Sequence, residues 1–148
     1  MEVNLKRILE EVNAWTFIDK HQKAADILDS LLCELNYNYS FIFHYRRIEI
    51  ASHLQDLKVL DHKYQDFLRR FPKQENEFKL SRIFIKKLNG KHNSCEIEEL
   101  FKKNIHDFGV SAPALFGLSL CSLEQGDYKK AIHLLHQTLQ EDSSWYPA

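Results

Sequence analysis

The amino-acid sequence predicts an all-α protein, an antiparallel stack of about eight helices, and three observations lead to this fold class. Apolar residues recur at i, i+3, i+4 and i+7 through most of the 148 residues, as in amphipathic helices. Short breaks divide the chain into pieces of about three to four helical turns. The second piece of each successive pair repeats the same apolar pattern, which indicates an internal repeat.

The first four predicted helices span residues 3–16, 20–35, 40–54 and 57–70. The second of them carries the clearest apolar stripe, formed by Ile27, Leu28, Leu31, Leu32 and Leu35. The polar segment Asn36–Ser40 separates this helix from the third, and Phe71-Pro72 ends the fourth because proline cannot continue a helix. Phe41–Phe43 taken alone could form a strand, but no hairpin turn flanks it, so we predict helix there.

The last four predicted helices span residues 75–88, 95–107, 112–125 and 128–141. Arg82–Ile85 is a second strand-like segment, and its position inside a longer helical pattern favours helix. The final helix shows the helical spacing again, in Ala131, Ile132, Leu135 and Leu139. The breaks between these helices contain Asn89-Gly90, Gly109, Gly126 and Ser143-Ser144.

The second helices of the four pairs align on one position, occupied by Ala24, Leu60, Ile97 and Ala131. These residues are 36, 37 and 34 positions apart. A period near 34 is typical of helix-turn-helix arrays, in which one unit cannot bury its apolar face alone and stacks on its neighbours. We therefore expect a single domain, residues 1–148, with units over about 3–36, 40–72, 75–109 and 112–144.

The turn before the last predicted helix reads Gln125-Gly126-Asp127-Tyr128, and Ala131-Ile132 follows. This unit resembles a tetratricopeptide repeat, a family in which the glycine makes the tight turn, the aromatic residue packs under it and the small residue permits close helix contact. Phe71-Pro72 is similar to the proline that ends a repeat, whereas Asn89–Ser94 and Ser119 depart from the family pattern. The resemblance implies a right-handed superhelix with a concave face that binds other proteins.

A narrower resemblance concerns the two ends of the chain. Trp15 precedes a helix with Ala24-Ala25, and Ser144-Trp145-Tyr146-Pro147 follows the last repeat. This combination is similar to the N-terminal repeat module of scaffold subunits in the anaphase-promoting complex, a cell-cycle ubiquitin ligase. Those modules homodimerise, so the resemblance implies a homodimerising assembly subunit of a large complex.

Composition limits the classes of partner and the cellular compartment that we expect for this chain. The formal net charge is −1, with 20 basic against 21 acidic residues, so we expect no nucleic-acid partner. No signal peptide is evident, and the longest uncharged apolar stretch, Ala112–Leu123, is too short to span a membrane, so we expect no membrane partner. Three widely spaced cysteines suit a reducing compartment, and we expect the cytoplasm or nucleus.

No motif indicates catalysis, a metal site or a cofactor, so we predict a protein that is not an enzyme and has no cofactor. His133 and His136 lie at i, i+3 on one helix and lack the further ligands of a zinc site, and His92 with Cys95 lacks a second pair. We expect these histidines to occupy exposed or half-buried helix positions and not to bind a metal. Cys33 and Cys121 lie in apolar helical segments and are expected to be small core residues.

Charged residues on predicted first helices indicate a binding surface. In the register that the family resemblance implies, Lys79, Arg82 and Lys86 share one helix face and line the concave groove. The preceding unit contributes Tyr45, Arg46 and Glu49. Such a groove would accept an acidic or carboxylate-ended protein segment, because arginine offers forked donors to carboxylates. The alternative is an ordinary solvated helix face, which needs no partner.

The C-terminal end suggests a second surface. A terminal repeat leaves one apolar side uncovered unless a further helix caps it. Here that edge would comprise Phe116, Leu120, Leu123 and Trp145. We expect it to be covered by a second chain, by further repeats of a longer array, or by the short tail folding back over its own last helix.

Together these observations predict a non-enzymatic scaffold or adaptor that binds a protein or peptide. The alternative is an obligate homodimer whose role is the assembly of a larger complex.

Overall fold

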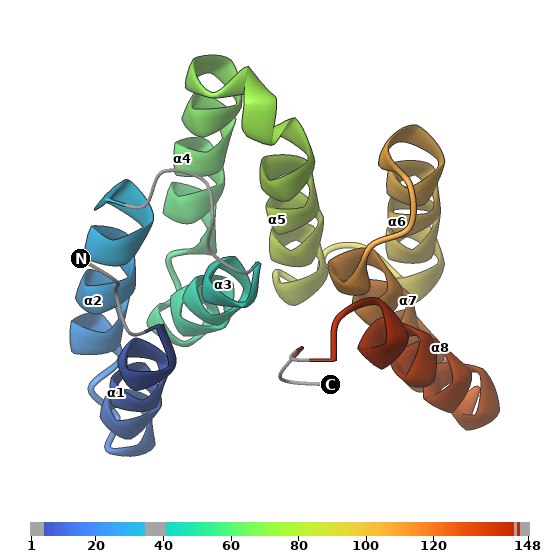
Figure 1. The fold of residues 1–148 in the computed structure, drawn as a ribbon, viewed down its shortest axis with the longest axis horizontal. Coiled ribbons are helices and arrows are strands. Elements are labelled where there is room, and N and C mark those ends of the chain that lie inside the picture. The colour runs from blue at the N-terminus through green and yellow to red at the C-terminus, as the bar shows by residue number, and fades with distance from the viewer. Residues whose placement is uncertain (1–4, 35–40, 144, 146–148) are drawn as a thin grey trace. The chain divides into compact units, whose positions relative to one another are not determined.

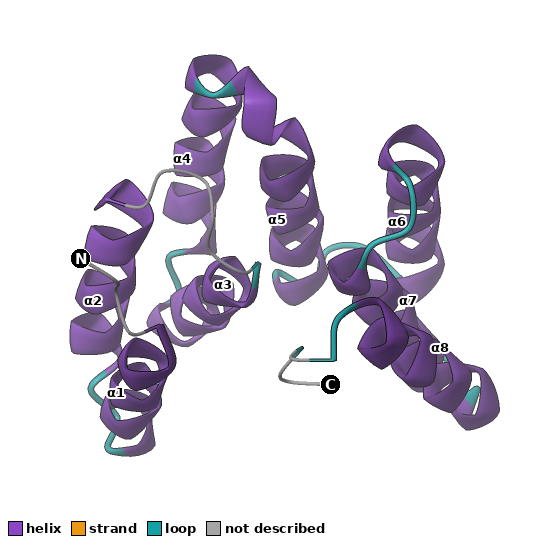
Figure 2. Ribbon diagram, in the orientation of Figure 1, coloured by secondary structure: helices purple, strands orange, loops and turns teal. Residues whose placement is uncertain are grey.

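The structure, a computed structural model, describes residues 5–34, 41–143 and 145, and within them the chain forms helices and turns without a strand (Figure 1, Figure 2). The predicted all-α fold class is confirmed. A short 3₁₀ helix, η1 (Pro72–Gln74), lies at the predicted proline break. The α-helices are α1 (Leu5–Phe17), α2 (His21–Glu34), α3 (Ile42–Leu54), α4 (Leu57–Arg70), α5 (Glu75–Leu88), α6 (Ser94–Phe108), α7 (Ala112–Glu124) and α8 (Tyr128–Glu141).

The helix boundaries follow the sequence prediction closely. Both strand-like segments are helical: Ile42 and Phe43 open α3, and Arg82–Ile85 lies within α5. The prediction did not contain η1. It forms because the proline ring fixes φ near the helical value while the missing N–H prevents α4 from continuing.

The chain divides into two compact units, Met1–His62 and Lys63–Ala148. In the first unit, α2 packs against both α1 and α3. Its core includes fully buried Val12, Ala24 and Leu28. Arg47 on α3 is buried and reaches across to Asp29 on α2, with Nε 2.8 Å from Oδ1, so the charge taken out of water is paired.

In the second unit, each helix from α5 to α8 packs against the next, and α5 also contacts α7. Aromatic rings dominate the core of this unit. Phe84 on α5 lies 5.0 Å from Phe101 on α6 and 6.4 Å from Phe116 on α7, measured between ring centroids. Gly117 allows the close approach of α7 to α6, since a Cβ at this position would lie only 2.2 Å from Phe101 Cζ.

The turn between α7 and α8 explains why Gln125-Gly126-Asp127 suits a helical hairpin. Gly126 has φ of +78°, a left-handed conformation that costs glycine little. Its N–H donates to the Leu123 carbonyl at 3.1 Å, and the Asp127 N–H donates to the Ser122 carbonyl at 2.9 Å. These two bonds form a Schellman motif that ends α7. The Asp127 carboxylate then accepts from the Lys130 N–H at 3.2 Å and caps α8.

The same helix ending occurs in two other turns of the chain. Asp19 between α1 and α2 has φ of +60°, and Gln55 between α3 and α4 has φ of +59°. In both turns the N–H of the following residue donates to the carbonyl five residues earlier. Lys20 donates to Trp15 at 2.8 Å, and Asp56 donates to Ala51 at 3.0 Å. The three left-handed residues, Asp19, Gln55 and Gly126, each lie five residues before an aligned position. Those positions are Ala24, Leu60 and Ala131 in the same order.

The turn between α5 and α6 departs from this geometry, as its sequence predicted. Gly90 has φ of +75°, but the aligned position, Ile97, follows it by seven residues. The two extra residues let Asn93 act as a separate helix cap, its side chain accepting from the Glu96 N–H at 2.9 Å. The connection between α5 and α6 is therefore longer than those that follow α1, α3 and α7.

Glu98 joins α6 to the hairpin of α7 and α8. Its carboxylate accepts hydrogen bonds from Gln125 Nε2 at 3.0 Å and Lys130 Nζ at 3.3 Å, and it pairs with Lys102 Nζ at 3.2 Å on its own helix. The bond from Gln125, followed by those from Lys102 and Lys130, lowers the pKa of Glu98 to about 2.

We predict that Glu98→Gln lowers the free energy of unfolding by about 1–2 kcal/mol near neutral pH. Because the pKa of Glu98 is lower in the folded state, its contribution is complete above about pH 4.5 and is lost as the pH falls toward 2. Urea unfolding at several pH values should show the difference from the parent shrinking over this range. Glu99→Gln, at a 75% exposed side chain on the same helix, is the control and should have little effect.

Among the described residues, no helix is both long enough and apolar enough to cross a membrane.

Candidate functional site

The three basic residues predicted on α5 lie together in a hollow of about 220 Å³ between α5 and α6. Lys79, Arg82 and Lys86 occupy one face of α5, while Phe78, Phe84 and their buried neighbours occupy the other. From α6, residues at i, i+3, i+4 and i+7 complete the wall. We call this hollow the basic groove; it is lined by Lys79, Arg82, Ile83, Lys86, Leu100, Lys103, Asn104 and Asp107.

Charge in the basic groove is strongly positive. Four cationic side chains and one carboxylate, that of Asp107, line it. Lys79 pairs with Glu75 at 2.5 Å and lies 5.4 Å from the ring centre of Phe108, a cation–π distance. Lys86 and Lys103 form no ion pair with any residue in the described ranges, so their charge is available to a ligand.

Asn104 is the most buried polar residue of the groove, with 4% of its surface exposed. Its Nδ2 donates to Asn76 Oδ1 at 2.9 Å, a bond that ties α6 to the first turn of α5. Its Oδ1 meets no hydrogen-bond partner among the residues that the structure describes. This hydrogen bond between the two amides helps to hold α6 against α5 at the groove.

Lys103, Asn104 and Asp107 were not predicted from the sequence as part of this surface. Their spacing on α6 shows that they share a face, but it does not show that this face lies beside that of Lys79 and Lys86. The helix packing of α5 on α6 supplies that information.

The residues predicted from the preceding unit belong to the first compact unit. Arg46 and Glu49 line a separate hollow of about 370 Å³ with residues of α1, α2 and α3. The Arg46 guanidinium donates from one terminal nitrogen to Glu49 Oε1 at 2.8 Å and from the other to Asn13 Oδ1 at 2.8 Å, so both terminal nitrogens serve the fold. Tyr45 is buried, and burial, followed by the charge of Glu49, raises its pKa above the usual range. Its ring thus packs in the core and is not open to a partner.

The predicted C-terminal edge is partly covered by the chain itself. Phe116 and Trp145 are each 4% exposed, and their ring centroids lie 5.6 Å apart. Trp145 thereby folds back over α7, as one of the sequence alternatives proposed. Leu120 is half-buried and Leu123 is 41% exposed, so part of this edge remains on the surface.

The cysteines and histidines occupy ordinary structural positions. Cys121 is fully buried, as predicted, and burial raises the pKa of its thiol to about 11, so it is uncharged at neutral pH. The side chain of Cys33 lies outside the described residues. His44 is buried and its pKa falls to about 3, while His133 and His136 are exposed. In the described part of the chain, no three metal-binding side chains gather into a cluster.

Comparison with models of known protein families gives no match, and comparison with curated proteins gives none.

Proposed function

We propose that this chain is a non-enzymatic adaptor built from tetratricopeptide-like repeats, and that its basic groove binds an acidic segment of a partner protein. The convergence of Lys79, Lys86 and Lys103 on one hollow is the observation that carries the proposal. Two of these lysines are unpaired, and the amide pair behind them is already fixed by its own hydrogen bond. Cations gathered in one groove favour a carboxylate-rich segment by charge complementarity.

The repeated turns support the repeat architecture. A Schellman ending recurs at the same distance before Ala24, Leu60 and Ala131, and a repeated helix-turn-helix unit would have such a turn. The longer turn between α5 and α6 accounts for the weak pattern of the third unit. Free thiols at Cys95 and Cys121 fit a reducing compartment such as the cytoplasm or nucleus.

A charge-reversal experiment tests the groove. We predict that Lys79→Glu, Lys86→Glu and Lys103→Glu together weaken binding of a labelled oligo-glutamate peptide at least ~10-fold and reduce its salt dependence. Fluorescence anisotropy at several salt concentrations measures both effects. Arg82 is left unchanged because it interacts with other residues of the chain.

The matched control is Lys58→Glu, Lys73→Glu and Lys91→Glu, three exposed lysines outside the groove that give the same change in net charge. This control should retain most of the affinity. Equal losses in the two triple variants would mean that only net charge attracts the peptide. Tighter binding of single-stranded DNA than of the peptide would contradict a protein partner.

A further inference from the structure

We propose that the segment bound by the basic groove carries a bulky apolar side chain at one end of its acidic residues, and that this side chain packs on Phe108 and Val110. The assignment depends on the function proposed above, because it concerns the same groove. It adds an apolar contact to the charged one and fixes the direction in which the segment lies. An aromatic side chain of the partner suits such a contact, since it buries much apolar area on few rotatable bonds.

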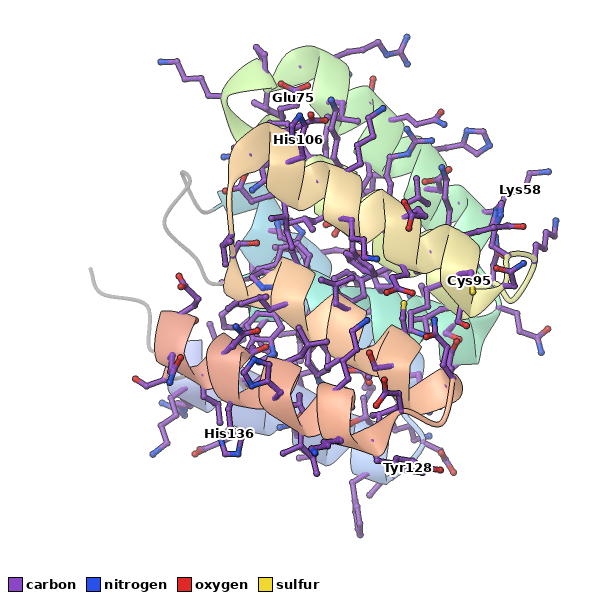
Figure 3. All side chains as sticks on the ribbon, turned by 90° about the vertical axis from the view of Figure 1, so that its right-hand side faces the viewer. Lys58, Glu75, Cys95, His106, Tyr128 and His136 are labelled. Atoms are coloured by element: carbon purple, nitrogen blue, oxygen red, sulfur yellow. The ribbon has the colours of Figure 1, made fainter. Side chains whose placement is uncertain are left out.

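The two helices that form the groove run in opposite directions, so different residues form its two ends. Asn76, in the first turn of α5, accepts a hydrogen bond from Asn104, in the second half of α6, at 2.9 Å. Figure 3 shows the same arrangement: Glu75 lies beside His106 near the end of α6, while Cys95, near the start of α6, lies at the opposite end of that helix. The start of α5 and the end of α6 therefore share one end of the groove.

This end of the groove, which we call the aromatic end, exposes apolar surface. Phe108 is 38% exposed and Val110 is 56% exposed. Gly109 between them has φ of +89°, and its N–H donates to the Ile105 carbonyl at 2.8 Å where α6 ends. Ser111 then caps α7, so Val110 lies between two defined helix ends. A partner that covers both side chains gains by removing further apolar surface from water.

The charge at the aromatic end does not favour an acidic side chain. Lys79 Nζ lies 5.4 Å from the ring centre of Phe108 and pairs with Glu75 at 2.5 Å. Asp107, which precedes Phe108, also lines the groove. Two carboxylates beside one ammonium repel a further carboxylate and leave an uncharged side chain as the better occupant.

The cations that remain for acidic side chains lie farther along the groove. Lys86 follows Lys79 by seven residues on α5, and Lys103 precedes Phe108 by five residues on α6. Neither Lys86 nor Lys103 forms an ion pair within the described ranges. Acidic residues of the partner should therefore lie beside these two lysines, while its apolar residue lies at the aromatic end.

The carboxylates nearest to these lysines along α6 have partners of their own. Glu99, one turn before Lys103, pairs with Lys102 at 3.7 Å. Glu96, three residues earlier, bonds to His92 Nδ1 at 3.0 Å. Because both glutamates are engaged by neighbours, a carboxylate of the partner supplies the opposite charge that the two groove lysines lack.

The length of the groove sets the spacing that a partner needs. The seven residues from Lys79 to Lys86 correspond to a rise of about 10 Å along α5. An extended segment covers about 10 Å with roughly three residues. We therefore expect the apolar residue to lie within about three or four residues of the acidic ones.

Three labelled peptides test this assignment by fluorescence anisotropy. The first has four glutamates flanked by serine on both sides, and the other two replace either the N-terminal or the C-terminal serine with tryptophan. One tryptophan peptide should bind the parent chain at least ~5-fold more tightly than the serine peptide, and the other should show no such gain. Because the added contact is apolar, this ratio should persist as salt weakens the binding of all three peptides.

Variants of the aromatic end locate the contact. Phe108→Ala combined with Val110→Ser should remove the advantage of the tryptophan peptide and leave the affinity for the serine peptide nearly unchanged. Val59→Ser, at a 69% exposed valine that does not line the groove, is the matched control and should keep the advantage. If the double variant loses helicity in far-UV circular dichroism, Val110→Ser alone replaces it, since Val110 is exposed and lies outside the helices.

The possible outcomes separate the apolar contact from the function of the groove. If the serine peptide binds and neither tryptophan raises the affinity, the apolar contact is absent and the binding of acidic segments stands. Equal gains in both orientations, or a gain that survives in the double variant, would place the tryptophan elsewhere and overturn the assignment. If none of the three peptides binds the parent chain, the function proposed for the groove fails together with it.

Discussion

Gly117→Ala should destabilise the second unit by about 3 kcal/mol or more, although alanine normally stabilises a helix relative to glycine. The added methyl group would lie 2.2, 2.4 and 2.5 Å from three ring atoms of Phe101. That ring is fully buried and rests against Phe84 at 5.0 Å, so it has no free space into which to move. The helix α7 would therefore have to separate from α6, with loss of packing between them.

Urea unfolding followed by circular dichroism measures this effect. A second variant tests its cause: adding Phe101→Leu to Gly117→Ala shortens the opposing side chain and should make the combined loss smaller than the sum of the two single losses. If Gly117→Ala is as stable as the parent, or more stable, α7 and α6 do not approach as closely as the structure shows.

The contact between Gly117 and Phe101 illustrates which structural features can be predicted from the sequence and which cannot. The helices were predictable because apolar spacing and breaks such as Phe71-Pro72 are local signals. The turn at Gly126 was predictable because the sign of φ restricts the residue type. The role of Gly117 was not, since it depends on Phe101 of another helix. In the sequence Gly117 is only a glycine inside an apolar helix, where it lowers helix propensity.

The candidate site shows the same limit. The basic stripe of α5 followed from helical spacing, whereas Lys103 required knowledge of which face of α6 meets α5. Tyr45 was predicted on a binding face but is buried. Polar and apolar residues are mixed around α3, so its exposed face cannot be identified from periodicity. Trp145 was placed at an open edge, and only the folded chain shows that it covers Phe116.

Ala131→Glu should have a comparably large effect, unfolding the hairpin of α7 and α8 or lowering its stability by about 3–5 kcal/mol. Ala131 is fully buried at the aligned position of the last unit, on the side of α8 that packs against α7. A carboxylate there would lose its water without gaining a partner. Thermal unfolding followed by far-UV circular dichroism measures the loss, and Gln140→Glu, at an exposed position on the same helix, should leave the transition nearly unchanged.

The pH dependence of the stability of Ala131→Glu distinguishes an effect of the introduced charge from an effect of the larger side chain. Burial would raise the pKa of the introduced carboxyl group above that of an unfolded chain, so the folded state would bind the proton more tightly. The loss of stability should then be greatest near pH 7 and become smaller as the pH falls through the raised pKa, relative to the parent measured at the same pH. A loss that is the same at pH 5 and pH 7 would assign the effect to side-chain size. An unchanged melting curve would mean that Ala131 does not lie where the helices touch, and that the repeat register built on it is wrong.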